Sequence, residues 1–202
     1  MPENLTFELV ADKSRLAEYL RRNAHLNYYH LGDLDDFYWP NTTWYSAVGA
    51  GEIRAVALKY ENFDGPIILG ILNENDAEMR WLLEQVKPLL PEKIYAHFSP
   101  GLESILEDTY EMDDHGPHFK MVLRVAAKIN ALETSEVKQI TPEQEGEVLT
   151  LFEKAYPGNW FNPSMLATGM YYGWSCEAGV LRSIAGVHVY SPEYSVAAIG
   201  NV

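Results

Sequence analysis

The sequence predicts an α/β (α+β) protein made of two tandem units, each a mixed, mostly antiparallel sheet flanked by helices, with the second unit incomplete. Three observations support this class. Strand-like alternation is interleaved with segments of helical period along the whole chain. The order of expected elements in residues 1–130 begins again in residues 131–202. The pattern of turns and strands in residues 53–72 is also repeated in residues 181–202.

In the first unit, residues 5–10 alternate as a strand, and Asp12 suits the N-cap of a helix. A second helix is expected over residues 24–38, with an apolar and aromatic stripe interpreted as core rather than a cofactor site. Antiparallel strands follow at 44–48, 53–60 and 66–72, with turns at Ala50-Gly51 and 62–65. Asn75 or Asp76 then caps a helix that Pro91 ends, and a strand at 93–98, a helix at 102–110 and a strand at 119–127 complete the unit.

The second unit follows a linker at residues 130–135. A strand is expected at 137–140, and Thr141-Pro142-Glu143 is typical of a helix start. Residues 156–161 form a loop rich in Gly, Asn and aromatic side chains, and residues 162–166 form a short helix. Strands at 171–176, 181–190 and 195–201 complete the chain.

An internal repeat appears when the sequence is shifted against itself by 128 residues. Ala50-Gly51 then falls on Ala178-Gly179, residues 53–57 fall on 181–185, and Ile71 falls on Ile199. We expect the strand registers to agree throughout, because a slip of one residue turns every side chain to the other face. The alternative is two unrelated β-meanders.

Composition limits the classes of function. Fifteen basic against 29 acidic residues give a net charge of −14, which argues against nucleic acid and anionic membranes as partners. The negative electrostatic field of such a protein attracts a cationic substrate such as an amine. The alternative is that the acidic side chains only keep the protein soluble. No signal peptide or membrane-spanning apolar run is visible, so we expect a cytoplasmic protein.

Cysteine and histidine spacing gives little support to a metal site. Cys176 is the only cysteine, so no internal disulfide is expected, and no Cys/His cluster has zinc spacing. Asp113, Asp114, His115 and His118 offer a weak metal alternative without an evident third ligand, and we predict no metal. Hydrolase, P-loop and dinucleotide fingerprints do not occur in the sequence.

The second unit resembles the GNAT superfamily of N-acyltransferases. The resemblance rests on its element order, on the "SIAGV" strand, on the turn at Ser191-Pro192-Glu193 and on the closing Ile199-Gly200-Asn201-Val202. It implies that residues 131–202 form the front half of such a domain. In that family a Q/R-x-x-G-x-G/A turn follows the fourth strand and its backbone N–H groups hold the pyrophosphate of acetyl-CoA. The sequence stops at Val202, before this turn, so we expect doubtful acetyl-CoA binding and little activity.

The first unit resembles the degenerate N-terminal copy of tandem members of the superfamily. After its fourth strand come Asn73-Glu74-Asn75-Asp76-Ala77-Glu78, without glycine and with three carboxylates near a helix start. Carboxylates there favour the helix dipole but repel a pyrophosphate. We therefore expect no acetyl-CoA binding in this unit.

The resemblance also implies site residues. The backbone of Ile199, Gly200, Asn201 and Val202 would lie along the acyl and pantetheine arm. Gly200 within a strand marks either a close backbone approach or simple packing. Glu193 is a candidate general base, although its turn is expected to be exposed.

Other candidates surround this strand. Tyr190 is a second candidate catalytic residue, on the same face of its strand as His188. Tyr156, Trp160 and Phe161 come from the loop that lines the acceptor pocket in relatives, and with His188 they are the predicted pocket. Alternatively, Trp160 and Phe161 only anchor the loop by packing, and His188 is an ordinary histidine of a strand.

The function implied is transfer of an acetyl group from acetyl-CoA to a small-molecule amine. The alternative is a non-catalytic binding module on the same scaffold. Its last strand would then be an open edge that pairs with a partner strand or with a second copy as a homodimer.

Overall fold

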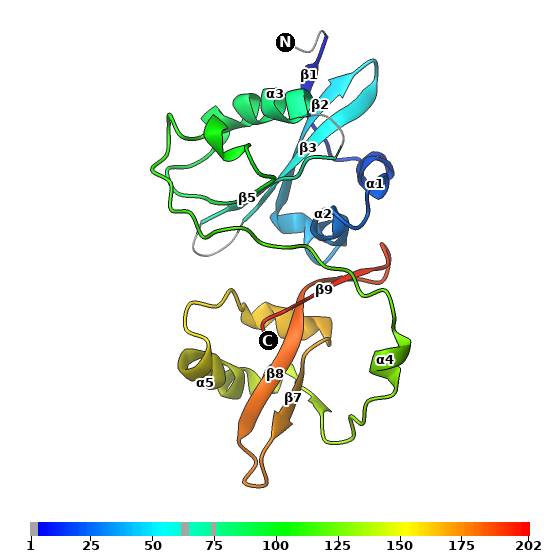
Figure 1. The fold of residues 1–202 in the computed structure, drawn as a ribbon, viewed down its shortest axis with the longest axis vertical. Coiled ribbons are helices and arrows are strands. Elements are labelled where there is room, and N and C mark those ends of the chain that lie inside the picture. The colour runs from blue at the N-terminus through cyan, green and yellow to red at the C-terminus, as the bar shows by residue number, and fades with distance from the viewer. Residues whose placement is uncertain (1–3, 62–64, 74–75) are drawn as a thin grey trace. The chain divides into compact units, whose positions relative to one another are not determined.

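The computed structural model describes residues 4–61, 65–73 and 76–202, and the chain forms two compact units, Met1–Lys120 and Met121–Val202 (Figure 1). The mixed α/β class is confirmed, with one five-stranded and one four-stranded sheet. Among the described residues, no helix combines the length and the apolar character needed to cross a bilayer.

The N-terminal unit is built on the five-stranded sheet, in the order β1-β2-β3-β4-β5. Neighbouring strands are antiparallel except β4 and β5, which run parallel because α3 connects them. The elements are β1 (Thr6–Leu9), α1 (Lys13–Arg21), α2 (Tyr28–Asp33), β2 (Thr42–Gly49), β3 (Glu52–Tyr60), β4 (Ile67–Gly70), α3 (Asp76–Val86) and β5 (Tyr95–Phe98), with 3₁₀ turns at Trp39–Asn41, Lys87–Leu89 and Glu103–Ile105.

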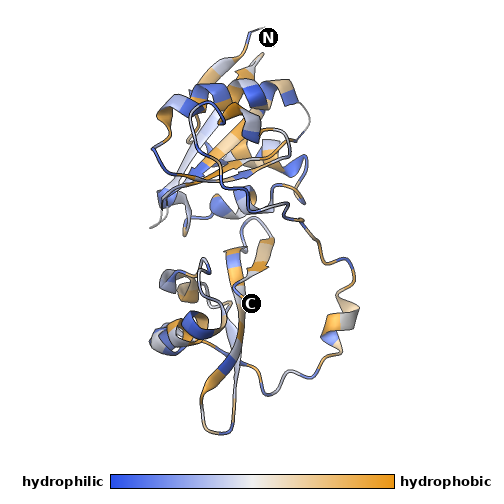
Figure 2. Cartoon of the chain, turned by 60° about the vertical axis from the view of Figure 1, so that its left-hand side comes forward, coloured by the Kyte–Doolittle hydropathy of each residue, from blue (hydrophilic) through white to orange (hydrophobic). Residues whose placement is uncertain are grey.

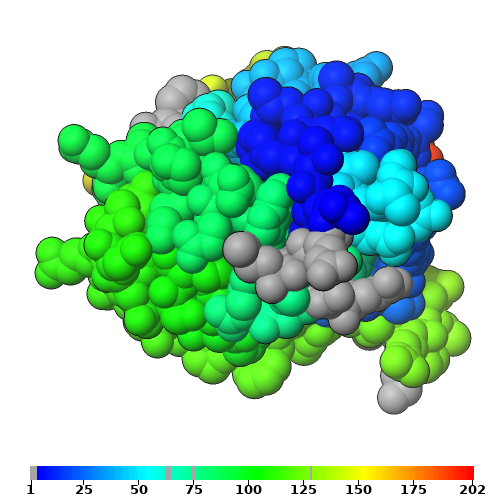
Figure 3. Space-filling view, turned by 90° about the horizontal axis from the view of Figure 1, so that it is seen from above, coloured from blue at the N-terminus to red at the C-terminus, as the bar shows by residue number. Residues whose placement is uncertain are grey.

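Helix α3 packs on one face of this sheet because its apolar side chains recur at helical spacing. Met79, Leu82, Leu83 and Val86 form a buried cluster with side chains of β2 and β3, namely Tyr45, Ala47, Ala55 and Ala57. Apolar colour accordingly concentrates on the sheet, and hydrophilic colour on the outer sides of the helices (Figure 2). In space-filling view, the blue N-terminal residues lie between the green α3 region and the cyan β2–β3 hairpin (Figure 3).

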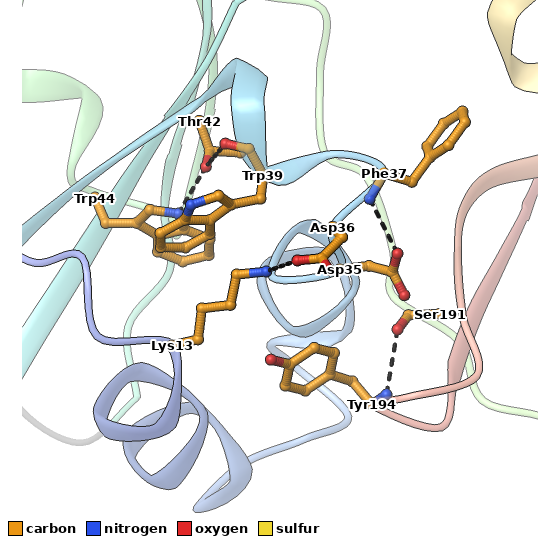
Figure 4. Close-up of polar contacts among 9 residues, drawn as sticks. All are labelled: Lys13, Asp35, Asp36, Phe37, Trp39, Thr42, Trp44, Ser191 and Tyr194. Carbon is orange, nitrogen blue, oxygen red and sulfur yellow. Dashed lines mark hydrogen bonds and ion pairs between the residues drawn. The ribbon is translucent and has the colours of Figure 1, made fainter.

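Polar and aromatic contacts hold the segment after α2 in place (Figure 4). Lys13, in the first turn of α1, forms an ion pair with Asp36. The rings of Trp39 and Trp44 stack with centroids 6.0 Å apart, and Trp44 Nε1 donates to the Thr42 hydroxyl at 2.8 Å. The Asp12 side chain accepts from the Arg15 backbone N–H, as its predicted capping role requires.

Three predicted elements of this unit are wrong in extent or type. The helix expected over 24–38 is limited to Tyr28–Asp33, and that expected over 102–110 is the 3₁₀ turn Glu103–Ile105. Residues 119–125 form no strand: Phe119 and Met121 are 85% and 88% exposed, and none of the ladders in the described chain includes this segment. Alternation alone does not make a strand without a neighbouring edge to bond. Residues 62–64, Glu74 and Asn75, named above in the turn and the helix cap, lie outside the described residues.

The C-terminal unit has a four-stranded antiparallel sheet in the order β6-β7-β8-β9. A capping box between Thr141 and Gln144 starts the 3₁₀ turn Pro142–Gln144, which leads directly into the helix Glu145–Ala155. Val148 and Phe152 of that helix pack in a core with Tyr171, Ile184 and Val187. The elements are α4 (Ala127–Asn130), β6 (Lys138–Gln139), a 3₁₀ turn at Pro142–Gln144, α5 (Glu145–Ala155), a 3₁₀ helix at Pro163–Thr168, β7 (Tyr172–Ser175), β8 (Leu181–Ser191) and β9 (Val196–Gly200).

The first hairpin of each sheet carries a bulge at the same place in the repeat. Ala47 pairs with Ala55 and Val48 with Ile53, which leaves Arg54 as the extra residue. Trp174 pairs with Ser183 and Ser175 with Leu181, which leaves Arg182 as the extra residue, 128 positions after Arg54. A bulge of this kind bends the strand and increases its local twist.

The expected agreement of registers does not extend through the repeat. The β2–β3 connection is residues 50–51, whereas the β7–β8 connection is residues 176–180. Ile71 lies after the end of β4, whereas Ile199 lies inside β9 and pairs with Val187. The physical reason is that turn length and a further bulge in β8 reset the register, and neither shows in an ungapped shift.

Candidate functional site

A groove of about 660 Å³ opens in the C-terminal unit between α5, β8 and the end of β9. Its volume falls within the range of sites for small molecules, roughly 300–1,000 Å³. Apolar walls and a few polar groups together suit a ligand with an apolar body and a polar end. Its lining residues are Leu151, Phe152, Ala155, Tyr156, Arg182, Ser183, Ile184, His188, Gly200, Asn201 and Val202.

His188 enters this groove from a second bulge in β8. The register passes from Val187 paired with Ile199 to Val189 paired with Ala198, so that His188 is the extra residue. A β-carbon added to Gly200 would lie 1.8 Å from His188 Cδ2 and 2.1 Å from Nε2. The imidazole therefore packs directly on the backbone of Gly200, and any side chain at position 200 would displace it.

A buried hydrogen-bond network holds the end of β9 against β8. Asn201 is 4% exposed and has a φ of 55°, a left-handed conformation that Asn tolerates better than most residues. Its Nδ2 donates to the Tyr171 hydroxyl oxygen at 2.8 Å, and that hydroxyl donates to the Val187 carbonyl at 2.9 Å. Burial raises the pKa of Tyr171, so the hydroxyl stays protonated and can donate. The network thus fixes both strands immediately beside the His188 bulge.

Arg182 is the only Lys, Arg, Asp or Glu among the lining residues of the groove. Next to it, a backbone hydrogen bond with Val180 and the Arg182 side chain lower the pKa of the Cys176 thiol. Burial lowers the pKa of His188, so its imidazole is neutral near pH 7. The groove therefore combines one cation with a neutral imidazole, and no carboxylate side chain lines it.

Five of the residues predicted from the sequence line this one groove: Tyr156, His188, Gly200, Asn201 and Val202. Ile199, predicted with the last three, does not line it, and its side chain is 78% exposed. Ile199 lies within β9, whereas β9 ends at Gly200 and the left-handed φ of 55° at Asn201 interrupts the pleat, so Gly200, Asn201 and Val202 do not follow the alternation of the strand.

The two aromatic residues of the preceding loop lie differently. Phe161 packs on the core, with its ring centroid 5.1 Å from that of Phe152 and 5.6 Å from that of Tyr171. Trp160 is half-buried and, like Phe161, is not among the lining residues. Phe161 has the contacts of a packing anchor.

Neither candidate catalytic residue lines the groove. Glu193 is exposed in the turn between β8 and β9, where the Ser191 hydroxyl accepts from the Tyr194 backbone N–H at 3.2 Å (Figure 4). Tyr190 is half-buried and packs against the core of its unit. The bulge explains why Tyr190 and His188 do not share the groove, because it breaks the period of two between them.

Sequence reasoning missed three contributors to the groove: Arg182, Tyr171 and the bulge at His188. Arg182 had a signal, since it repeats Arg54 at the shift of 128 residues. The hydrogen bond from Asn201 to Tyr171 joins residues that are 30 positions apart, and no local pattern marks it.

A metal has no evident site in the described part of the chain, where no three His, Cys, Asp or Glu side chains could hold an ion together. His115 Nε2 lies 3.9 Å from the Asp113 carboxylate. The His118 ring lies 6.2 Å, centroid to centroid, from that of His97.

A separate set of buried titratable side chains lies in the N-terminal unit. His30 is 1% exposed, and burial together with the charge of Lys120 lowers its pKa to about 3. Burial raises the pKa of Asp33 to about 8. Lys120 Nζ donates to the Leu26 carbonyl and lies 4.7 Å from the ring centre of Tyr28, and burial lowers its pKa to about 8. Near pH 7 the first two groups are therefore neutral.

Comparison of the chain with protein-family models, with curated proteins and with solved structures finds no match. The functional assignment therefore depends on the groove and on the residues that line it.

Proposed function

We propose that the chain is an N-acyltransferase of the GNAT kind, which transfers an acetyl group from acetyl-CoA to a small-molecule amine. One observation carries this proposal. Gly200, Asn201 and Val202, which the resemblance assigns to the acyl arm, line the same groove as Tyr156 and His188, which it assigns to the acceptor pocket. These residues come from three elements that lie apart in the sequence.

The chemistry of acyl transfer suits this groove. The thioester carbonyl needs a donor for its developing negative charge, and the backbone at the end of β9 is the expected source. Apolar side chains of α5 and β8, with Leu151 and Ile184 among them, line the groove and offer an apolar surface to the acyl and pantetheine arm. The N-terminal unit is proposed as a structural partner that binds no acetyl-CoA.

Acetyl-CoA and S-acetylpantetheine, which lacks the pyrophosphate, are the probes that test the proposal. In line with the doubtful binding and little activity expected from the sequence, we expect each probe to raise the unfolding temperature in a saturable way only at high concentration. Release of free thiol should be slow and should depend on an added amine. Filling the groove with Ala155→Trp should abolish both effects. Ala178→Trp, in an exposed turn outside the groove, is the matched control. A flat titration with both probes, or full binding by Ala155→Trp, would contradict the proposal.

A non-catalytic binding module is the second candidate, and the position of β9 favours it. This strand is at the edge of the four-stranded sheet, and Ile199 on it is 78% exposed. Such an edge can pair with a partner strand or with a second copy of the chain. Sedimentation should then show dimers that Ile199→Lys dissociates, together with no response to acetyl-CoA.

A further inference from the structure

We propose that His188 is the group that accepts the proton of the acceptor amine, and that Tyr171 and Asn201 position it. This inference rests on the proposed acyl transfer. It gives the catalytic role to His188, which the sequence predicted only as a pocket residue, in place of the catalytic candidates Glu193 and Tyr190. Glu193 and Tyr190 do not line the groove, whereas His188 does.

The imidazole of His188 lies beside the predicted acyl arm. Its Cδ2–Nε2 edge packs on Gly200, since a β-carbon there would lie 1.8 Å and 2.1 Å from these two atoms. Gly200 ends β9 and belongs to the backbone stretch, residues 199–202, that the proposal assigns to the acyl arm. Because the His188 ring packs on Gly200, its nitrogen is within reach of an amine that approaches the thioester carbonyl carbon.

A bulge in β8 brings His188 to the groove beside Gly200. An extra residue in one strand of an antiparallel pair aims its side chain in a direction that regular pleating does not allow, and bulges are over-represented beside active sites. The bulge follows Val187, whose carbonyl accepts from the Tyr171 hydroxyl, and Asn201 holds that hydroxyl from the other strand. Tyr171 and Asn201 are therefore positioning residues, which act through His188 and the backbone.

His188 is also in the protonation state that a base requires. Burial keeps the pKa of His188 below its ordinary value, so the neutral ring is available as a base near pH 7. The other titratable side chains that line the groove are Tyr156, which directly follows α5, and Arg182 from β8; the side chains of Asn201 and Val202 after β9 do not titrate. His188 is therefore the only lining side chain that is a neutral base at this pH.

In the proposed step, the neutral amine nitrogen attacks the thioester carbonyl carbon and the C–N bond forms. The N–H proton of the amine passes to a ring nitrogen of His188. The C–S bond breaks and its electron pair leaves with sulfur as a thiolate. The imidazolium then gives its proton to the thiolate, so the products are an amide and a free thiol and His188 is neutral again.

The test is the dependence of kcat/KM on pH for acetyl-CoA with a primary amine, in wild type and in His188→Gln. His118→Gln, an exposed histidine of the N-terminal unit, is the control. We expect His188→Gln to lose about 10²–10⁴-fold in kcat and the acidic limb of the profile, and to keep the saturation temperature shift with acetyl-CoA. His188→Gly should regain part of the rate when free imidazole is added, which a purely structural role would not produce.

The outcomes distinguish failure of the proposed acyl transfer from failure of the role of His188. If wild type neither binds acetyl-CoA nor transfers acetyl, the proposed function is wrong and the role of His188 is wrong with it. If wild type is active and His188→Gln keeps its rate and its acidic limb, only the role of His188 is overturned. If His188→Gln does not fold, the test is the rescue of His188→Gly by imidazole. Acetyl transfer restored by imidazole supports the inference. Transfer at the wild-type rate without imidazole, or a folded variant that imidazole does not rescue, overturns it.

Discussion

Asn201 Nδ2 lies 2.8 Å from the hydroxyl oxygen of Tyr171, and both side chains are almost completely buried. The same hydroxyl donates to the Val187 carbonyl at 2.9 Å. One phenol group therefore joins the end of β9 to β8 beside the bulge at His188. Buried polar groups of this kind are costly when one partner is removed, because the others then lack both water and a protein partner.

Tyr171→Phe removes this hydroxyl, so the Asn201 amide keeps only its contact of 3.5 Å with Met165 Sδ and the Val187 carbonyl loses the hydroxyl donor. We expect the free energy of unfolding of the C-terminal unit to fall by about 1–3 kcal/mol. Urea unfolding followed by circular dichroism measures the change. Tyr172→Phe, the neighbouring and 43% exposed tyrosine, is the matched control and should change stability by less than about 0.5 kcal/mol. Equal losses in the two variants would show that the network contributes nothing.

Gly200→Ala places a β-carbon where the His188 ring lies, 1.8 Å from Cδ2. The ring must move, so we expect a loss of about 1–3 kcal/mol. In a His188→Ala background the same substitution should cost much less, because the two sites share one contact. Gly146→Ala in α5, where the added carbon has no neighbour within 4 Å, should instead stabilise by about 0.5–1 kcal/mol. Additive effects at positions 188 and 200 would contradict the contact.

Asp33→Asn tests the buried carboxyl of the N-terminal unit. Burial raises the pKa of Asp33 from 3.8 to about 8, so the folded state holds a proton that the unfolded state loses above pH 4. Its contribution to stability is complete below pH 3.8 and is lost as pH rises towards 8. The amide does not ionise, so the variant should match wild type near pH 4 and exceed it at pH 8, on the order of 1–3 kcal/mol.

The matched control for this effect is Asp113→Asn, which makes the same change in net charge at a side chain that is 93% exposed. Thermal unfolding over pH 4–8 compares the three proteins. An advantage of Asp33→Asn that stays constant with pH, or one shared by Asp113→Asn, would show that Asp33 is ionised in the folded state.

Ala50→Asn tests the difference between the two repeated turns. Ala50 has a φ of 53° in the turn between β2 and β3, and Gly51 follows it at 81°. Asn tolerates this conformation and Asn-Gly is the preferred pair in such a two-residue turn, so we expect a gain of about 0.5–1 kcal/mol. Ala178→Asn should give none, since Ala178 is not among the described residues with a positive φ. A similar gain at both positions, measured by urea unfolding, would mean that the two turns share one conformation.

Local patterns predicted the elements well where a helix or strand meets the partner that its apolar face requires. The helix with Met79, Leu82, Leu83 and Val86 forms as its spacing predicts, because these side chains pack on the sheet. The strand expected at 119–127 failed for the opposite reason. Its alternation is regular, but no neighbouring strand in the described chain bonds to it, and Phe119 and Met121 are exposed.

The candidate site shows the same division. The sequence by itself determined the α/β class, the strand that contains Gly200 and the helix of the groove wall, because these follow from period and turn chemistry. Only the tertiary structure decided that Glu193 and Tyr190 lie outside the groove, that His188 is the extra residue of a bulge, and that Asn201 bonds to Tyr171. The physical reason is that a bulge and a contact across 30 residues depend on how strands pair, which no local pattern of residues specifies.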